Sequence, residues 1–306
     1  MAVKTKKRAV LMCAGEYEPV PILRNPDHAD KNPCDAWIFV AVDGGLGRFL
    51  KQGIEPDLIL GDFDSLGEEY RDYLEAVEAS QPEKLLRLPC EKDDTDTMYA
   101  LRVCLEKGCS EFLLYGALGG RLDHTIANIQ ALAWLKKHGA DGYLCGRNTI
   151  VTVLQSETVF LPEEYEGTFS LFALDSRVTG VTLRGMKYPL QEAVLENTFP
   201  IGVSNEIRRK TQDDVPADIR EADICGKPCC GKEKRASVTV REGMALMILE
   251  RPETVFPVYP QKRDRVTGTG SISGGIFGKR CEEMEGEMPA AMPDPSEMTR
   301  NHYDLL

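Results

Sequence analysis

Two aspartates that follow a short apolar segment are the residues of this chain best placed to do chemistry. Asp62 and Asp64 stand in Gly61-Asp-Phe-Asp-Ser-Leu66, directly after the apolar residues 58–60. Residues two apart on an extended segment share one face, so the two carboxylates are expected to point the same way. Paired carboxylates at a strand end suit a hard cation, most simply Mg2+ carrying a nucleotide phosphate. For an isolated pair of aspartates, the alternative interpretation is that one caps the following helix and the other is exposed to solvent.

A second acidic cluster stands at the start of a predicted helix. The segment Lys92-Asp93-Asp94-Thr95-Asp96 holds three acids in its last four residues. Acids at a helix start offset the positive end of the helix dipole, but repulsion at this density favours a cation bound among them. Asp96 is therefore expected to complete the metal site of Asp62 and Asp64.

Two glycine-containing turns add groups that suit a phosphate. In Asp43-Gly44-Gly45 the glycines let the backbone approach a ligand, and Asp43 can bind that ligand or its metal; a capped tight turn is the alternative. The segment from Gly116 to Arg121 contains Gly119 and Gly120 and leads into a predicted helix, where free amides and the helix dipole favour an anion. Arg121 adds a forked cation.

Three polar residues of that predicted helix are spaced to share one face. Arg121, His124 and Asn128 lie three and four residues apart. A structural hydrogen bond is the commoner role for a lone histidine such as His124, and neither a Ser-His-Asp spacing nor a serine elbow is present. Acidic metal sites beside a phosphate cradle indicate phosphoryl or pyrophosphoryl transfer, in which the protein positions groups and neutralises charge. These residues alone do not identify the acceptor.

The elements that must position these clusters alternate in type up to about residue 146. The spacing of apolar residues predicts strands over 8–13, 36–42, 58–61, 84–88, 111–115 and 142–145, and helices over 46–52, 68–79, 95–107 and 122–138. Such alternation predicts a parallel sheet covered by helices, a three-layer α/β domain that binds its ligand beyond the carboxyl ends of the strands.

After residue 148 the helical period gives way to short alternating segments. Strands are predicted over 149–154, 157–161, 168–173, 178–183, 193–196, 237–241 and 244–250, which is typical of an antiparallel β-sandwich. The domains are therefore expected at 1–148 (catalytic, ATP-binding α/β), at 149–252 (β-sandwich, with a polar insertion at 207–235) and at 253–306 (an extended or partly disordered tail).

Composition narrows the functional classes. The net charge of −12 argues against general nucleic-acid binding. Ten scattered cysteines favour reduced thiols and a cytoplasmic setting, and no stretch is long enough to span a membrane. The basic and apolar residues 4–14 are too short for a signal peptide and are expected to form a strand. Cys225, Cys229 and Cys230 lack a second pair at zinc-ligand spacing, so a mobile loop is the favoured interpretation, and the glycine-rich segment 268–275 is interpreted as a linker.

These clusters, in this order, resemble the thiamine pyrophosphokinase (thiamine diphosphokinase) family. The matching stretches are 41–45, 53–66, 92–101, 116–128, 185–190, 202–206 and 238–249. The resemblance implies transfer of diphosphate from Mg-ATP to the hydroxyl of thiamine, giving thiamine diphosphate and AMP. It also implies a catalytic α/β domain, a β-sandwich that binds vitamin B1, and a homodimer with its active sites between subunits.

The resemblance assigns roles by motif position. The magnesium residues are Asp62, Asp64 and Asp96, and the further catalytic residues are Arg121 and Asp123. Residues expected to bind the nucleotide or thiamine are Asp43, Gly44, Gly45, Lys92, Thr95, Gly119, Gly120, His124, Asn128, Ser204 and Asn205. Two alternatives stay open: a diphosphokinase for another hydroxymethyl heterocycle such as a pterin, and a non-catalytic sensor of thiamine or nucleotide.

Overall fold

A computed structural model describes most of the chain. The described residues are 7–16, 37–64, 66–89, 94–161, 165–207, 236–250 and, by backbone alone, 261–265. The chain divides into a unit Met1–Val266, which holds all of these, and a unit Thr267–Leu306, which lies outside them. Several sequence-based predictions also lie outside the described residues: Lys92, nearly all of the 207–235 insertion with its three cysteines, and the glycine-rich segment 268–275.

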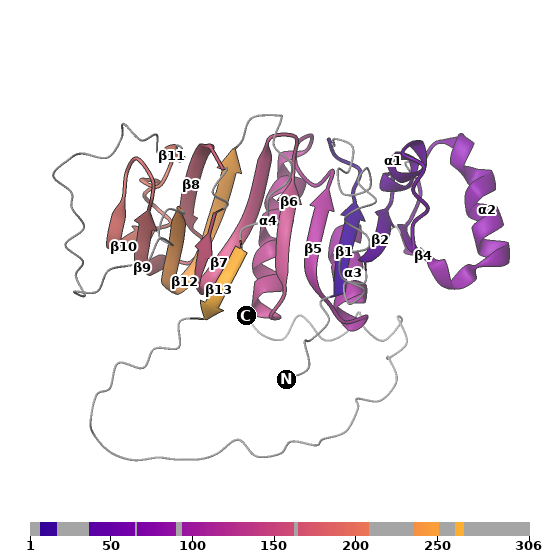
Figure 1. The fold of residues 1–306 in the computed structure, drawn as a ribbon. Helices are drawn as coiled ribbons and strands as arrows, with labels where there is room; N and C mark the ends of the chain where they lie inside the picture. The colour runs from indigo at the N-terminus through magenta and orange to yellow at the C-terminus, as the bar shows by residue number, and fades with distance from the viewer. Residues whose placement is uncertain are drawn as a thin grey trace, which may run out of the picture. The chain divides into compact units, whose positions relative to one another are not determined.

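Six parallel strands form the N-terminal part of the sheet. They are β1 (Lys7–Met12), β2 (Trp37–Val42), β3 (Leu58–Gly61), β4 (Leu85–Arg87), β5 (Cys109–Tyr115) and β6 (Asp141–Cys145). Their order is β4-β3-β2-β1-β5-β6 (Figure 1). Strands β2, β3 and β4 are therefore added in sequence on one side of β1, and β5 and β6 are added on its other side. The strand order reverses between β1 and β5, which is where an open α/β sheet leaves a crevice for ligands.

Four helices cover the two faces of these strands. They are α1 (Gly45–Lys51), α2 (Arg71–Ser80, after the 3-10 turn Glu68–Tyr70), α3 (Asp96–Glu106) and α4 (Leu122–Lys137). Alternate residues of β1 divide between two buried clusters, as side chains on a pleated strand do. Val10 packs in the cluster of α1 and α2, and Leu11 in the cluster of α3 and α4. The predicted three-layer α/β arrangement is confirmed.

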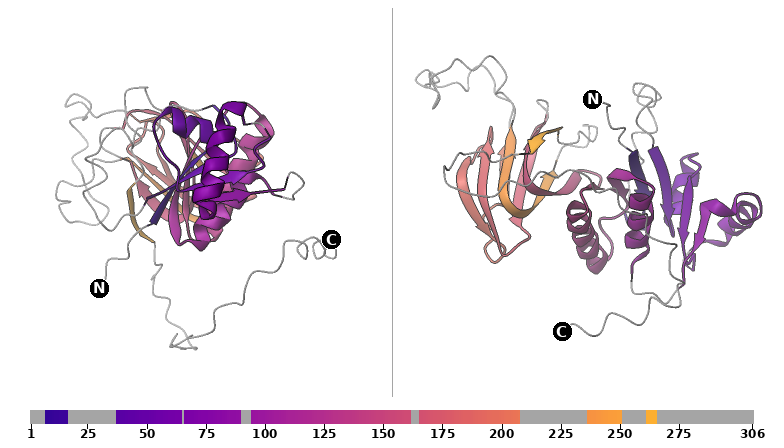
Figure 2. Two further views of the ribbon diagram at one scale, coloured as in Figure 1. Left: turned by 90° about the vertical axis from the view of Figure 1, so that its right-hand side faces the viewer. Right: turned by 90° about the horizontal axis from the view of Figure 1, so that it is seen from below.

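The C-terminal part is built almost entirely of strands. They are β7 (Thr149–Phe160), β8 (Gly167–Ala173), β9 (Arg177–Arg184), β10 (Leu190–Glu196), β11 (Asn205–Ile207), β12 (Ser237–Glu250) and β13 (Gln261–Arg265). Strand β12 pairs with β7 along its length, while its first part also pairs with β9 and its last part with β8. Seen from below, the ribbons of these strands curve (Figure 2). One long strand thus links two layers.

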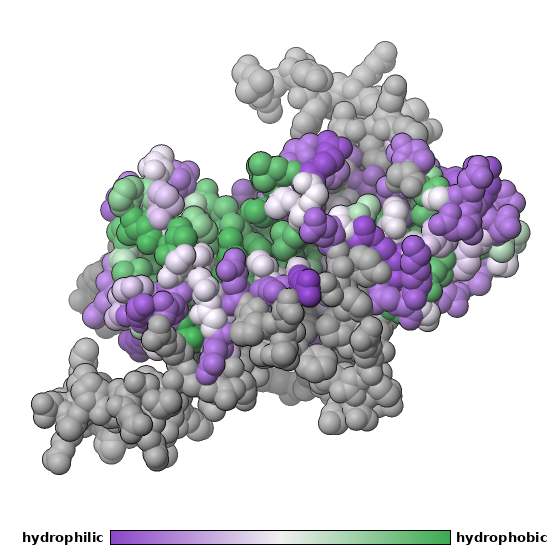
Figure 3. Space-filling model, turned by 90° about the horizontal axis from the view of Figure 1, so that it is seen from above, coloured by the Kyte–Doolittle hydropathy of each residue, from purple (hydrophilic) through white to green (hydrophobic). Residues whose placement is uncertain are grey.

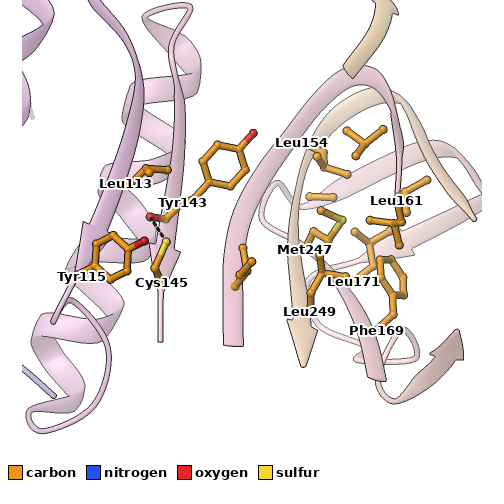
Figure 4. Close-up of a cluster of buried hydrophobic side chains, with 14 of the residues drawn as sticks. Leu113, Tyr115, Tyr143, Cys145, Leu154, Leu161, Phe169, Leu171, Met247 and Leu249 are labelled. Atoms are coloured by element: carbon orange, nitrogen blue, oxygen red, sulfur yellow. Dashed lines mark hydrogen bonds between the residues drawn. The ribbon is translucent and has the colours of Figure 1, made fainter. Parts of the chain in front are cut away.

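The two parts of the sheet are joined by hydrogen-bonded strands. Strand β6 pairs antiparallel with β7, so thirteen strands form one continuous sheet. On one face, Tyr143 and Cys145 of β6 belong to the same buried cluster as Phe169 and Met247 of the strand-rich part (Figure 4). The predicted domain boundary near residue 148 lies in the short turn between these two strands.

An ion pair network lies at the start of β6 and connects α4, β6 and β7. Lys136 Nζ of α4 is 2.7 Å from Asp141 Oδ1 of β6 and 2.5 Å from Glu157 Oε1 of β7. The side chains of Lys136 and Glu157 are about nine-tenths buried. Partners for buried charges stabilise them against their desolvation, so this network fixes α4 and β6 to β7.

The structure differs from the sequence-based strands in four places. Segments 149–154 and 157–161 form one strand, β7, with Ser156 at φ 49° inside it. Segments 237–241 and 244–250 form one strand, β12, whose register shifts between Val240 and Met244. Polar residues interrupt the apolar alternation at both points, and the sequence analysis therefore ended one strand there and began another. Strands β11 and β13 were not predicted, and β13 lies inside the segment predicted as a tail. Among the described helices, none is long and apolar enough to cross a membrane.

Candidate active site

Three carboxylates come together where two neighbouring strands end. Asp43 follows β2, and Asp62 and Asp64 follow β3; one oxygen of each lies within 4.8 Å of the others. The pairing of β2 with β3 brings these strand ends side by side, and the Asp43 N–H donates to the carbonyl of Leu60 at 2.8 Å. Among the described residues, this is the group whose carboxylates could hold a metal ion. The sequence had placed Asp96 with Asp62 and Asp64; the structure places Asp43 there.

Asp62 and Asp64 meet for a reason that the sequence did not show. The expected extended backbone is absent, because β3 ends at Gly61 and Phe63 has a φ of 63°. This left-handed residue reverses the chain locally, and the Asp64 N–H donates to Asp62 Oδ1 at 3.2 Å. The Phe63 ring packs against the core and the Arg87 guanidinium lies 5.6 Å from its centre. A tight turn, rather than a pleated strand, brings the two carboxylates together.

A cavity of about 530 Å³ lies beside Asp43 at the point where the strand order reverses. Its walls come from the turns after β1, β2 and β5 and from the first residues of α3 and α4. The predicted residues that line it are Asp43, Thr95, Asp96, Gly119, Gly120, Arg121, His124 and Asn128. The residues that line it without having been predicted include Cys13, Ala14, Gly15 and Thr97. Gly44 precedes α1 and Gly45 is its buried first residue; neither lines the cavity.

Two turns form the floor of this cavity by backbone-to-backbone contact. The Gly15 N–H donates to the Gly116 carbonyl at 2.8 Å. A Cβ on Gly15 would lie 2.5 Å from that carbonyl oxygen, and a Cβ on Gly116 would lie 2.5 Å from the carbonyl oxygen of Cys13. Arg48 of α1 donates to the carbonyls of Ala14 and Gly15. The sequence offered no signal for this contact, because it joins segments a hundred residues apart.

Asn128 stabilises the glycine-rich turn before α4. Its amide Nδ2 donates to the Ala117 carbonyl at 2.8 Å, and its side chain is buried. Arg121, His124 and Asn128 all line the cavity, as their shared helix face predicts. The side chain of Asn128 therefore supports the turn, while the more exposed Arg121 and His124 lie at the start of the helix.

Arg121 and Asp123 form a two-point ion pair at the start of α4. Arg121 Nη2 lies 2.6 Å from Asp123 Oδ2, and Nε lies 3.2 Å from Oδ1. The hydrogen bond from Arg121 holds the pKa of Asp123 below its usual value, and the same bond raises the pKa of Arg121. Both side chains are exposed. Asp123 therefore occupies two of the guanidinium donors of Arg121, a residue that lines the cavity.

The acidic segment before α3 is partly neutralised by the chain itself. Asp94 pairs with Arg102 of α3. Thr95 is the N-cap of α3, and its Oγ1 accepts from the Met98 N–H at 3.2 Å. The charge density that suggested a bound cation thus has an internal partner in Arg102, while Asp96 remains at the cavity wall.

Cys13 lies in the wall of the cavity as a neutral thiol. Burial raises its pKa from 9.0 to about 11, although a hydrogen bond with Thr97 and the charge of Arg48 act in the opposite direction. The Cys13 Sγ lies 3.7 Å from Thr97 Oγ1. Nucleophilic cysteines need a lowered pKa, and burial shifts the pKa of Cys13 in the opposite direction.

Ser204 and Asn205 lie in the strand-rich part and do not line this cavity. Asn205 is buried, and its amide holds the backbone of Tyr188: Oδ1 accepts from the Tyr188 N–H at 2.9 Å, and Nδ2 donates to the Tyr188 carbonyl at 2.7 Å. Ser204 is exposed, with φ 60°. Tyr188, which had not been singled out, is 57% exposed beside them. Asn205 therefore fixes an exposed aromatic residue.

Comparison with known proteins identifies the family. Residues 33–144 match the thiamin pyrophosphokinase catalytic domain, and residues 156–217 match the thiamin pyrophosphokinase vitamin B1 binding domain. The thiamine pyrophosphokinase of Bacillus subtilis (strain 168) is 31% identical over 171 residues, which are 56% of this chain and 78% of that protein. The chain belongs to the thiamine pyrophosphokinase family. It is an enzyme of that family, as its resemblance predicted.

Solved thiamine pyrophosphokinase structures share the fold. The Bacillus subtilis enzyme aligns with a TM-score of 0.61 at 24% identity, covering 80% of this chain and 99% of that one. The Geobacillus thermodenitrificans protein aligns at 0.58 and 26% identity, covering 81% and 98%. The yeast enzyme aligns at 0.59 and 12% identity, covering 82% and 88%. The combination of an α/β part and a strand-rich part is thus common to the family.

Proposed function

We propose that this enzyme transfers diphosphate from Mg-ATP to the hydroxyl group of thiamine, with thiamine diphosphate and AMP as products. The observation that carries the proposal is the meeting of Asp43, Asp62 and Asp64 beside a cavity whose other wall is the glycine-rich start of α4. The carboxylates can hold the metal ion of a metal-bound polyphosphate. The start of α4 favours the negative charge of its phosphates. Membership of the family supports thiamine as the acceptor.

The three carboxylates suit Mg2+ by their chemistry. Mg2+ prefers oxygen ligands and binds through one or two carboxylates plus substrate phosphates, and this group offers three carboxylate oxygens within 4.8 Å of one another. Asp43, Asp62 and Asp64 would hold the ion, and Asp96, at the cavity wall, is the alternative third ligand that the sequence suggested. When bound, the ion would neutralise charge on the phosphate oxygens during transfer.

The chain's own groups would position the polyphosphate. The amides of Gly119 and Gly120 and the start of α4 favour its negative charge. Arg121 can bind its oxygens through the guanidinium donors that Asp123 does not occupy. In the reaction the thiamine hydroxyl oxygen attacks the β-phosphorus. The bond from that phosphorus to the oxygen bridging the α- and β-phosphates breaks, AMP leaves, and the hydroxyl proton is released.

A second copy of the chain would complete the thiamine site. Ser204 lies away from the cavity of its own chain, yet the surface around it is unusually apolar: Tyr188, Phe199, Ile201 and Val203 are between 49% and 66% exposed. From above, apolar residues gather over the strand-rich part (Figure 3). Exposed apolar patches mark interaction sites, and a two-fold dimer would bring this surface to the cavity of its partner.

The same proposal places the enzyme in the cytoplasm, as the scattered cysteines predict. The four cysteines among the described residues are free and buried: Cys13, Cys104, Cys109 and Cys145. Reduced thiols of this kind are usual in that compartment.

Mass spectrometry of the products after mixing protein, ATP, magnesium and thiamine tests the reaction. The expected products are thiamine diphosphate and AMP in equal amounts. Formation of thiamine monophosphate and ADP would contradict diphosphate transfer. Preferential use of a hydroxymethyl pterin over thiamine in direct competition would favour the related diphosphokinase, and absence of AMP release with either acceptor would favour a sensor.

Mixed dimers test the shared site. One mutant carries Asp62→Asn with Asp64→Asn, and the other carries Ser204→Ala with Asn205→Ala. Each alone should have little activity, but after unfolding and refolding together, one of the two sites in a mixed dimer receives intact acids from one chain and an intact pair from the other. Activity should return to a measurable fraction. If mixed dimers form without activity while refolded wild type is active, the site lies within one chain.

A further inference from the structure

Arg48 connects two parts of the candidate site that are far apart in the sequence. It lies in α1, five residues after Asp43, and its side chain is half-buried. Its Nη1 donates to the Gly15 carbonyl and its Nη2 donates to the Ala14 carbonyl, in the turn that follows β1. Two donors of one planar guanidinium thus bind two successive carbonyls. The rigid fork of arginine provides this geometry, and the compact ammonium of lysine does not.

This contact extends through the backbone to the glycine-rich turn after β5. The peptide unit that joins Ala14 to Gly15 accepts a hydrogen bond from Arg48 at its carbonyl. The N–H of the same unit donates to the Gly116 carbonyl at 2.8 Å. Hydrogen bonds linked in this way polarise and strengthen one another. A Cβ on Gly116 would lie 3.3 Å from Arg48 Nη1, so the guanidinium also lies against this second turn.

The glycine-rich turn is supported from α4 as well. Asn128 Nδ2 donates to the carbonyl of Ala117, the residue that follows Gly116, at 2.8 Å. Two helices, α1 through Arg48 and α4 through Asn128, therefore hold the segment that leads into α4. The support from α4 comes from the helix that the turn itself begins, whereas the support from α1 comes from the helix that follows Asp43.

The first turn of α1 is fixed beside the acidic group. The Leu46 N–H donates to the Asp43 carbonyl at 3.1 Å. A Cβ on Gly45 would lie 1.9 Å from the Met12 carbonyl oxygen, so the start of the helix packs directly on the end of β1. This short helix has a candidate metal-binding carboxylate just before it and Arg48 in its middle. It therefore connects the acidic group to the glycine-rich turn.

We propose that Arg48 is a positioning residue for the transfer. It holds the glycine-rich turn at a fixed distance from Asp43, Asp62 and Asp64, so that the phosphates at the start of α4 and the metal on the acids meet in the reactive arrangement. Arg48 acts through the carbonyls that it binds and not by touching the substrate. A misplacement of about 1 Å in such an arrangement can cost about 100-fold in rate. This role rests on the proposed function, because its turnover readout is the formation of thiamine diphosphate.

Turnover and ligand binding of Arg48→Ala, measured together, test this role. The kcat per folded molecule should fall about 10- to 100-fold while the KM for ATP changes less than about threefold, because misplaced groups slow the reaction without removing a binding contact. The affinity for α,β-methylene-ATP with magnesium, an analogue that cannot be cleaved at the bond that breaks, should stay close to that of wild type. Lys51→Ala, at an exposed position at the end of the same helix, is the matched control and should keep its turnover.

Other results would contradict the role. A large rise in the KM for ATP and weaker binding of the analogue, with kcat unchanged, would show that Arg48 binds the phosphates directly. A lower melting temperature with unchanged kcat and KM per folded molecule would show that Arg48 only stabilises the fold. Either result would overturn the proposal.

Arg48→Lys and chemical rescue guard against a variant that simply folds badly. Lysine keeps the charge but not the fork, so the kcat of Arg48→Lys should lie closer to that of Arg48→Ala than to that of wild type. Guanidinium ion at millimolar concentration should raise the kcat of Arg48→Ala, and ammonium ion should not. An unfolded protein gains no activity from a denaturant. Wild-type turnover in Arg48→Lys, or failure of guanidinium to raise the kcat of Arg48→Ala, would overturn the role of the fork.

Hydrogen exchange separates this role from the proposed reaction. In Arg48→Ala the amides of segments 13–16 and 115–118 should exchange faster than in wild type, because the backbone contact between the two turns opens more often; in Lys51→Ala they should not. If they exchange faster but wild type makes no thiamine diphosphate, the link made by Arg48 stands and the reaction is wrong. If thiamine diphosphate forms while Arg48→Ala matches wild type in exchange and kcat, the reaction stands and the role of Arg48 is wrong.

Discussion

The backbones of Gly61 and Asp43 lie in contact at the ends of two neighbouring strands. A Cβ on Gly61 would lie 3.0 Å from the Asp43 Cα and 3.2 Å from its Cβ. Gly61 also has a φ of 151°, a conformation that side chains other than glycine rarely adopt. The position of the Asp43 carboxylate therefore depends on the absence of a side chain at residue 61.

Gly61→Ala should displace Asp43 and lower turnover more than tenfold, and the strained φ should destabilise the fold by about 1–3 kcal/mol. Gly53→Ala is the control: Gly53 also has a positive φ, 72°, but a Cβ there would meet nothing within 4 Å. It should lose stability by denaturant unfolding and keep its turnover per folded molecule. Equal loss of turnover in both variants would contradict a specific contact with Asp43.

Magnesium titrations of turnover distinguish Asp43 from Asp96 as the third metal ligand. Asp43→Asn and Asp64→Asn should each lower turnover more than about 100-fold and raise the magnesium requirement, since even residues that only support metal ligands are worth 10- to 100-fold. Asp72→Asn, on the exposed side of α2, should behave like wild type. If Asp96→Asn shifts the magnesium requirement and Asp43→Asn does not, the assignment from the sequence is the better one.

Cys13 should make stability depend on pH in the alkaline range. The folded protein holds the pKa of this thiol at about 11, above its value of 9.0 without burial. A raised pKa contributes stability that is fully present below pH 9 and is lost as pH rises through about 11, by about 2–3 kcal/mol. The free energy of unfolding of wild type should therefore fall more steeply between pH 9 and 11 than that of Cys13→Ala. Parallel curves would contradict a buried neutral thiol.

Two truncations test the contribution of β13. Removing 255–306 deletes β13, which pairs with Phe160, Val159 and Glu157 of β7, whereas removing 267–306 keeps it. The shorter protein should melt lower, by about 2–8 °C if β13 is worth 1–2 kcal/mol. Both should keep the thiamine reaction, because the residues that line the cavity precede residue 129. Identical melting temperatures would show that β13 adds no stability.

The sequence predicted elements that depend on local pattern and missed those that depend on distant contact. Strand β3 was predicted residue for residue because its apolar run is bounded by Asp57 and Gly61. The two strands β7 and β12 were each divided, because Ser156 and the turn-like Glu242-Gly243 look like turns when the partner strand is unknown. Strand β13 has a fully polar sequence, and only its pairing with β7 makes it a strand.

The candidate site shows the same limit. Conspicuous residues such as Asp62, Asp64 and Arg121 were found from their spacing. The partner of Asp94 was not, because Arg102 lies eight residues further along the helix. The Gly15–Gly116 contact and the Arg48 bonds join segments that only the sheet order brings together. Asp43 likewise joins the acids through the pairing of β2 with β3.

The pairing of β6 with β7 leaves no flexible connection between the α/β part and the strand-rich part. In many two-domain enzymes the domains close over their substrates by rotating about a flexible connection. Here the pairs Tyr143–Thr152, Leu144–Val151 and Cys145–Ile150 would have to break before the strand-rich part could rotate, and Lys136 adds its ion pairs to that resistance. Exclusion of water from the reacting phosphates must then come from side chains, from loops, or from the arrival of a second subunit rather than from a swing of one half of the chain.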